Sequence, residues 1–168
     1  MFTAPATALM NQLSCSKKML LISIAFITPL VFTSYFLVSE QLIAMKFSKN
    51  ELTGVEYIVP VRRLIQHFPE HRGMTNAYLS GNKSFRPKIL AKRKQLAEDI
   101  RLIDEVDQRL GSQLGTTTQW NKIKSTWGRL ETEAFNGQAK EVFARHTQLI
   151  AEVLDLVKNI SDSSNLTL

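Results

Sequence analysis

Residues 138–160 read QAKEVFARHTQLIAEVLDLVKNI, and apolar side chains return in this stretch at steps of three and four residues. The recurring positions are Val142, Phe143, His146, Leu149, Ile150, Val153, Leu154, Val157 and Ile160. Because an α-helix turns once in about 3.6 residues, this spacing places them on one helical face. Such a face must be buried against other parts of the chain, and His146 is expected there as a hydrogen-bonded core residue.

Two earlier stretches show the same periodicity. One carries Trp120, Ile123, Trp127, Leu130 and Ala134. The other carries Ile89, Leu96, Ile100, Ile103, Val106 and Leu110. Thr117 and Thr118, which follow Gly115, are candidate N-caps of the first of these helices. Pro87 is expected in the first turn of the other helix, with Gly111 just past its end.

Residues 19–38, MLLISIAFITPLVFTSYFLV, contain no charge. A helix of this length covers the ~30 Å hydrocarbon core of a bilayer, and the stretch is longer than the apolar region of a cleaved signal peptide. We therefore expect an uncleaved transmembrane helix. Lys17 and Lys18 favour a cytoplasmic N-terminus, residues 1–18, and a periplasmic region, residues 39–168, at a bacterial inner membrane.

The transmembrane helix is predicted to continue through Glu40 to Tyr57, to be disturbed at Pro60 and Pro69, and to resume to about Leu79. Beyond the apolar segment the sequence has no extended period-two alternation, so strands are not expected.

The connections at residues 80–86, 111–117 and 135–138 are short and polar. Short connections favour antiparallel neighbours. The expected fold is all-α, with an N-terminal transmembrane helix continuing into an up-down-up-down four-helix bundle.

The composition excludes or disfavours several classes of protein. The chain has 168 residues and a formal charge of +6, but its 21 basic residues are scattered among 15 acidic ones. This pattern argues against nucleic-acid binding, because a phosphate backbone is tracked by a continuous basic stripe. The single cysteine, Cys15, excludes an intrachain disulfide.

His67, Glu70 and His71 spell H-x-x-E-H, a zinc-protease signature. Pro69 lies between the two histidines and is expected to spoil their spacing on one regular helical turn. With no other catalytic motif in the sequence, we expect no catalytic residue, no metal site, no cofactor and no enzymatic activity.

The run ELTGVEYIVPVRRLIQHFPEHRGMTNAYLSG, residues 51–81, resembles the E-x-x-G-x-x-Y-x-x-P segment and following H-R-G that open the extracytoplasmic sensor of bacterial methyl-accepting chemotaxis receptors. The matching positions are Glu51, Gly54, Tyr57, Pro60, His71, Arg72 and Gly73. Some membrane-bound diguanylate cyclases and histidine kinases carry the same segment, and nitrate- and nitrite-sensing helical domains are similar more distantly. Residues 143–168 resemble the later helices of these sensors.

The resemblance implies a membrane-bound sensor of a small ligand, and the cationic residues beside H-R-G lead us to expect an anion. Arg72 is the first candidate, because a guanidinium recognises anions in a planar, bidentate way, and Gly73 would let backbone approach closely. His71, Arg62 and Arg63 could widen the positive site. In the alternative, Arg72 pairs with a carboxylate of a neighbouring helix and Gly73 only permits close packing.

A bundle of this kind in the inner-membrane lipid buries a second apolar stripe only by pairing, so a dimer is expected. Receptors of this type normally continue with a second half of the sensor, another span and an output module. The chain is therefore expected to be the truncated input half of a receptor and to form a homodimer. A membrane-anchored bundle without a ligand is the alternative from another class. Tyr57 and Trp127 are expected in the core, not in a ligand cage.

Overall fold

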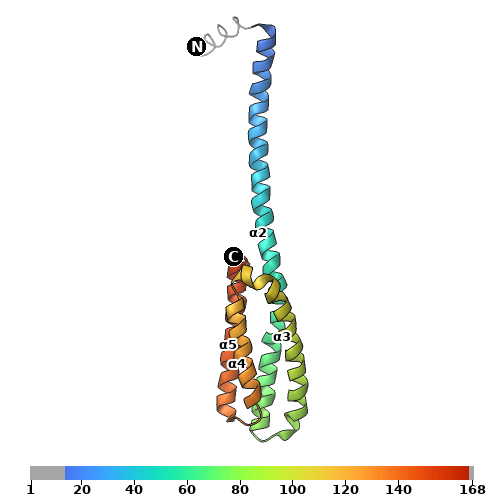
Figure 1. The fold of residues 1–168 in the computed structure, drawn as a ribbon, viewed down its shortest axis with the longest axis vertical. Coiled ribbons are helices and arrows are strands. Elements are labelled where there is room, and N and C mark those ends of the chain that lie inside the picture. Colours follow the sequence, from blue (N-terminus) through green and yellow to red (C-terminus); the bar gives the residue numbers. More distant parts are fainter. Residues whose placement is uncertain (1–13, 167–168) are drawn as a thin grey trace. The chain divides into compact units, whose positions relative to one another are not determined.

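The computed structural model describes residues 14–166, and this part of the chain is helical almost throughout (Figure 1). The α-helices are α2 (Cys15–Leu79), α3 (Arg86–Leu114), α4 (Thr117–Glu133) and α5 (Ala139–Ser163), with a short 3₁₀-helix, η1 (Lys83–Phe85), before α3. No strand occurs within these residues. The predicted all-α class is confirmed.

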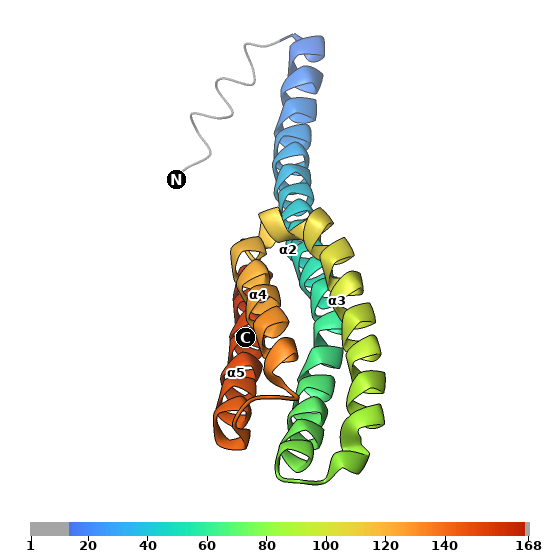
Figure 2. The same cartoon turned by 60° about the horizontal axis from the view of Figure 1, so that its bottom comes forward.

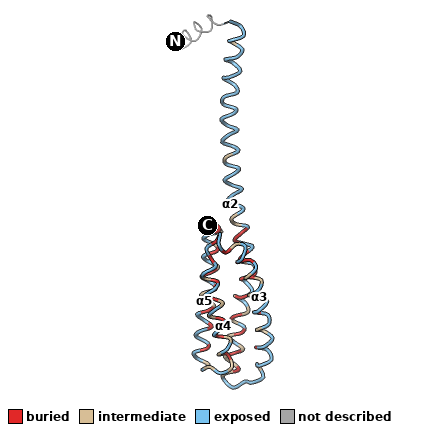
Figure 3. Tube along the Cα trace, viewed as in Figure 1, coloured by how far each residue is buried: buried red, intermediate tan, exposed pale blue. Residues whose placement is uncertain are grey.

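The chain divides into two compact units, Met1–Lys46 and Phe47–Leu168. The described part of the first unit is helical, and none of its residues is buried (Figure 3). Its apolar side chains lie on every side of the helix, and Phe26, Leu30 and Phe32 are each more than half exposed. By length and composition, α2 contains a segment that is long and apolar enough to cross a membrane.

In the second unit, the Phe47–Leu79 part of α2 packs beside α3, α4 and α5, as Figure 2 shows. All four helices contribute to one hydrophobic core. Its fully or almost fully buried side chains are Tyr57, Val61, Leu64, Phe68, Leu96, Ile103, Trp120, Ile123, Trp127, Leu130, Val142, Leu149, Val153, Leu156 and Ile160. The three predicted apolar stripes therefore supply most of the core.

Helix α2 runs through Pro60 and Pro69 without a break, so the predicted disturbance at these residues is wrong. A proline inside a helix costs about 3 kcal/mol because it removes a hydrogen bond and clashes with the preceding turn. Buried side chains on either side of the prolines, Tyr57 before them and His71 after them, hold the helix against the core. Packing of this kind supplies most helical stability in proteins and outweighs the local penalty.

Two predicted helix ends also differ from the structure. Pro87 does lie in the first turn of α3, but Gly111 lies inside this helix, which ends at Leu114 and is capped by Gly115 with φ 69°. Thr116, and neither Thr117 nor Thr118, is the N-cap of α4.

Thr116 makes no side-chain cap bond, because its hydroxyl donates instead to Asp107 Oδ1 at 3.1 Å. Tyr57 Oη donates to the same oxygen at 2.7 Å. Burial raises the pKa of Tyr57, so the phenol stays protonated and keeps this bond. The cluster joins α2, α3 and the α4 N-terminus.

The buried face of α5 is shifted from the predicted one. Leu156 is fully buried, whereas Phe143 and Leu154 are 41% and 50% exposed. Val142, His146, Leu149, Val153 and Ile160 are buried as predicted. The buried set, with Leu156 included, repeats strictly every seven residues, which is the narrow stripe of closely packed helices.

Candidate functional site

The five residues predicted to bind a ligand do not gather at one place. All lie on α2, and only His71 faces the core. Arg62 is exposed and has no partner in the described part of the chain, and Arg63 Nη1 lies 3.8 Å from Asp99 Oδ1 of α3. A shared positive site built from these residues is not formed in this structure.

His71 is fully buried and pairs with His146 of α5, His71 Nδ1 lying 2.9 Å from His146 Nε2. His146 Nδ1 lies 2.7 Å from the Val142 carbonyl oxygen, which can only accept, so this nitrogen carries the proton. His146 Nε2 then accepts from the Nδ1–H of His71. The predicted hydrogen-bonded core role of His146 is confirmed.

Both rings are held in the neutral state. Burial lowers the pKa of His71 to about 3, and the repulsion that a charged ring would meet from His146 and from the Arg93 cation acts in the same direction. Burial also lowers the pKa of His146, against the opposing effect of its bond to Val142. His71 Nε2 is an acceptor without a hydrogen-bond partner among residues 14–166, and the ring packs edge-on against Trp127 at 4.9 Å between centroids.

Arg72 bridges α2 and α5 by contacts that the sequence did not indicate. Its Nη1 donates to Thr147 Oγ1 at 3.0 Å, and its guanidinium carbon lies 4.6 Å from the centroid of the Phe143 ring. The alternative, in which Arg72 pairs with a carboxylate, is not what the structure shows, since the partners are a hydroxyl and an aromatic face. The partly exposed ring of Phe143 therefore makes a cation–π contact with Arg72.

Gly73 is not at a close helix contact, since a Cβ atom built on it would meet nothing within 4 Å. The alternative in which Gly73 permits close helix packing is therefore wrong. Gly54 of the same motif does have this role: a Cβ there would lie 2.0 Å from Ser164 Oγ at the end of α5. Tyr57 and Trp127 are core residues, as predicted.

The H-x-x-E-H residues lie on one continuous helix, so the argument that Pro69 separates the two histidines is wrong. The rings nevertheless have different partners. His67 Nδ1 lies 2.5 Å from Asp99 Oδ2 on α3, and His71 faces α5. Glu70 pairs with Lys92 of α3. Within residues 14–166, no group of three His, Cys, Asp or Glu side chains is arranged to hold a metal ion.

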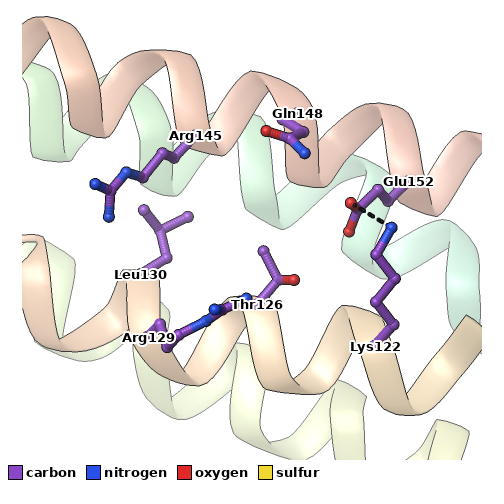
Figure 4. A pocket seen from close by; sticks show the side chains of 7 residues that line it. All are labelled: Lys122, Thr126, Arg129, Leu130, Arg145, Gln148 and Glu152. Carbon is purple, nitrogen blue, oxygen red and sulfur yellow. Dashed lines mark ion pairs between the residues drawn. The ribbon is translucent and has the colours of Figure 1, made fainter.

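A pocket of about 400 Å³ lies between α4 and α5. Figure 4 shows the side chains that line it: Lys122, Thr126, Arg129 and Leu130 from α4, and Arg145, Gln148 and Glu152 from α5. Three of these are cationic and one is a carboxylate, so the lining is positive overall. This positive lining makes the pocket a candidate binding site for an anion.

Charge in the pocket is only partly neutralised by the protein. Arg145 pairs with Glu133, and Lys122 Nζ lies 3.1 Å from Glu152 Oε1. Arg129 is exposed, and no described residue pairs with its guanidinium. A guanidinium that lines a pocket without a partner is suited to a carboxylate or another planar anion.

Sequence reasoning missed this pocket because its residues belong to the outer faces of two amphipathic helices. Lys122 and Arg129 are seven residues apart, as are Arg145 and Glu152, so each pair lies on one helical side. This spacing is visible in the sequence, but charged residues on the outer face of an amphipathic helix ordinarily contact only solvent, so the spacing alone does not indicate a binding site. Only the packing of α4 on α5 brings the two faces together.

No family model, no curated protein sequence and no solved structure matches this chain.

Proposed function

We propose that this chain is the membrane-anchored, ligand-sensing region of a bacterial receptor of the methyl-accepting chemotaxis type. The ligand is a small anion that binds in the pocket between α4 and α5. The observation that carries the proposal is the positive lining of that pocket, with Arg129 free of any protein partner in residues 14–166. An unpaired guanidinium in a cavity is more suited to binding than to catalysis.

The proposed architecture is an up-down-up-down four-helix bundle formed by the Phe47–Leu79 part of α2 together with α3, α4 and α5. The connections between these helices are short, which favours antiparallel neighbours. In this proposal residues 19–38 cross the bacterial inner membrane, the N-terminus is cytoplasmic and the bundle is periplasmic. Lys17 and Lys18 support this orientation.

The proposed mechanism is a shift between two packings of the helices. Ligand in the pocket would draw α4 and α5 together and change how α5 packs on α2, which it meets through His146 and His71 and through Thr147 and Arg72. A ligand can drive such a shift only by binding one packing more tightly than the other. Because α2 is one helix from Cys15 to Leu79, its displacement would be passed towards the apolar segment in a homodimeric receptor.

Two alternatives make different predictions. The same input region could serve a membrane-bound diguanylate cyclase or histidine kinase, since the proposal concerns the sensor and not the output. A structural, membrane-anchored bundle would have no ligand at all. The exposed apolar segment supports an anchor in each case, but the positive pocket favours a sensor.

The test is a thermal-stability screen of the full chain in lipid nanodiscs with nitrate, phosphate, acetate and succinate, at constant ionic strength set with chloride. Unfolding is followed by tryptophan emission, because both tryptophans, Trp120 and Trp127, are buried in the core. An anion present at 100 times its Kd should stabilise the folded state by about 2.7 kcal/mol.

Arg129→Gln should abolish the stabilisation, whereas Arg101→Gln should preserve it. Arg101 is exposed on α3 and pairs with Glu98 and Glu105 of its own helix, so the control removes the same charge without touching the pocket. If none of these anions raises the unfolding midpoint, or if both variants behave alike, the binding of a simple anion in this pocket through Arg129 is refuted.

A further inference from the structure

The two ends of the α4–α5 pocket differ in charge. Arg129 and Arg145 lie at one end, and the Lys122–Glu152 ion pair lies at the other (Figure 4). Because Arg145 is already paired with Glu133 and Arg129 is unpaired among the described residues, the first end has room for one negative group. The second end is already neutralised by its own ion pair.

Glu152 has an unused acceptor at that second end. Its Oε1 accepts from Lys122, but its Oε2 is buried and has no hydrogen-bond partner in the described part of the chain. A buried carboxylate oxygen without a donor is unfavourable, and such groups in folded proteins normally find one. A ligand that brings an N–H donor, above all a charged one, would satisfy Oε2.

The distance between the ends sets the length of the ligand. Arg145 and Glu152 are seven residues apart on α5, and Lys122 and Arg129 are seven apart on α4, which corresponds to about 10 Å along each helix. Thr126, Leu130 and Gln148 lie between the ends and offer both apolar and hydrogen-bonding contact. The α-carbon of an ordinary amino acid holds its two charged groups too close together to reach both ends.

We propose that the pocket between α4 and α5 binds an elongated zwitterion, whose carboxylate lies against Arg129 and Arg145 and whose ammonium group, several methylene groups away, donates to Glu152 Oε2. This inference rests on the proposed ligand-binding function and specifies its ligand. A plain anion fills only the first end. A dianion places its second negative charge beside Glu152.

The experiment is isothermal titration of the full chain in lipid nanodiscs with four matched compounds. They are ε-aminocaproate, its isomer norleucine, caproate, which lacks the amine, and adipate, which carries a second carboxylate in its place. ε-Aminocaproate should bind at least about tenfold more tightly than each of the others, because it alone adds a charge-assisted hydrogen bond at Glu152 without losing the carboxylate contact.

Two variants locate the ends of the ligand. Glu152→Gln should reduce the affinity for ε-aminocaproate to that for caproate, and Arg129→Gln should weaken both. Glu105→Gln, at an exposed carboxylate of α3, is the matched control and should leave all four affinities unchanged. Tryptophan emission of each variant verifies that the core is folded.

The outcomes separate this inference from the function on which it rests. If caproate, adipate or norleucine binds as tightly as ε-aminocaproate, the elongated zwitterion is excluded and an anion sensor remains. If none of the four binds while simple anions still stabilise the protein through Arg129, the inference alone fails. If neither these compounds nor simple anions bind, both proposals fail together.

Discussion

Helix α2 contains two segments rich in apolar residues, and they differ in how their apolar side chains are buried. In residues 19–38 the apolar side chains surround the helix, and no residue is buried. In residues 53–78 the buried positions recur at three- and four-residue steps on one face. Phe32 is 64% exposed, whereas Phe68 is 1% exposed.

The difference shows what each segment needs as its surroundings. One apolar face can be covered by three neighbouring helices, and the core of α3, α4 and α5 does cover it. A helix that is apolar all round is stable only where its whole circumference meets apolar material, as in a bilayer. Each segment can therefore be tested by substitutions that should matter in one of them and not in the other.

The largest effect is expected for Phe68→Ala, with Phe32→Ala as its matched control on the same helix. Removal of the buried Phe68 ring, which packs on Trp127 with 5.1 Å between centroids, should lower the free energy of unfolding by about 3 to 5 kcal/mol. Phe32→Ala should change it by less than about 0.5 kcal/mol. Guanidinium titration in nanodiscs, followed by tryptophan emission, measures both, and equal effects would erase the distinction.

Much of this fold could be predicted from the sequence, because periodicity decides which face of a helix is buried. Leu149, Trp120 and Ile103 were all placed in the core by spacing alone, and all are buried. The prolines misled the prediction, since a local penalty at Pro69 was weighed without the tertiary contacts of Phe68 and His71 that offset it.

The candidate site was less accessible to sequence reasoning. Arg72 was predicted either to bind an anion or to pair with a carboxylate, but the partners that it has, Thr147 and Phe143, lie about seventy residues away. In the sequence, Arg129 and Arg145 look like ordinary surface residues, and only the packing of α4 on α5 places them at one pocket. Which outer faces adjoin depends on the relative rotation of the helices, and short helical patterns do not determine it.

A charge in the apolar segment should have the next largest effect. Leu30 lies near the middle of residues 19–38 and is 67% exposed. Leu30→Arg should make membrane insertion less favourable by about 3 to 4 kcal/mol, which is the sum of the arginine penalty and the lost leucine contribution. The membrane-bound fraction after alkaline extraction measures this. Gln66→Arg, at an exposed position of the core-packed segment, should remain fully membrane-bound.

The smallest effect concerns the buried histidine pair and depends on pH. The pKa of His71 is about 3 in the folded chain and close to 6.5 when the chain unfolds, because burial disfavours the charged ring. Between these values the unfolded state binds more protons than the folded state, so the free energy of unfolding falls as the pH falls. His71 alone should contribute a loss of roughly 2 kcal/mol between pH 7 and pH 5.

His71→Asn isolates this contribution, since asparagine keeps an N–H donor close to the position of Nδ1 but takes up no proton. Denaturant titrations at pH 7 and pH 5 should give a smaller loss for the variant than for the natural chain, by up to about 2 kcal/mol. His146 remains in both proteins and, with its pKa lowered mainly by burial, adds the same direction of pH dependence. An identical loss in the two proteins would mean that His71 takes up its proton in the folded chain as readily as in the unfolded chain, and the buried, hydrogen-bonded pair that links α2 to α5 would then be incorrect.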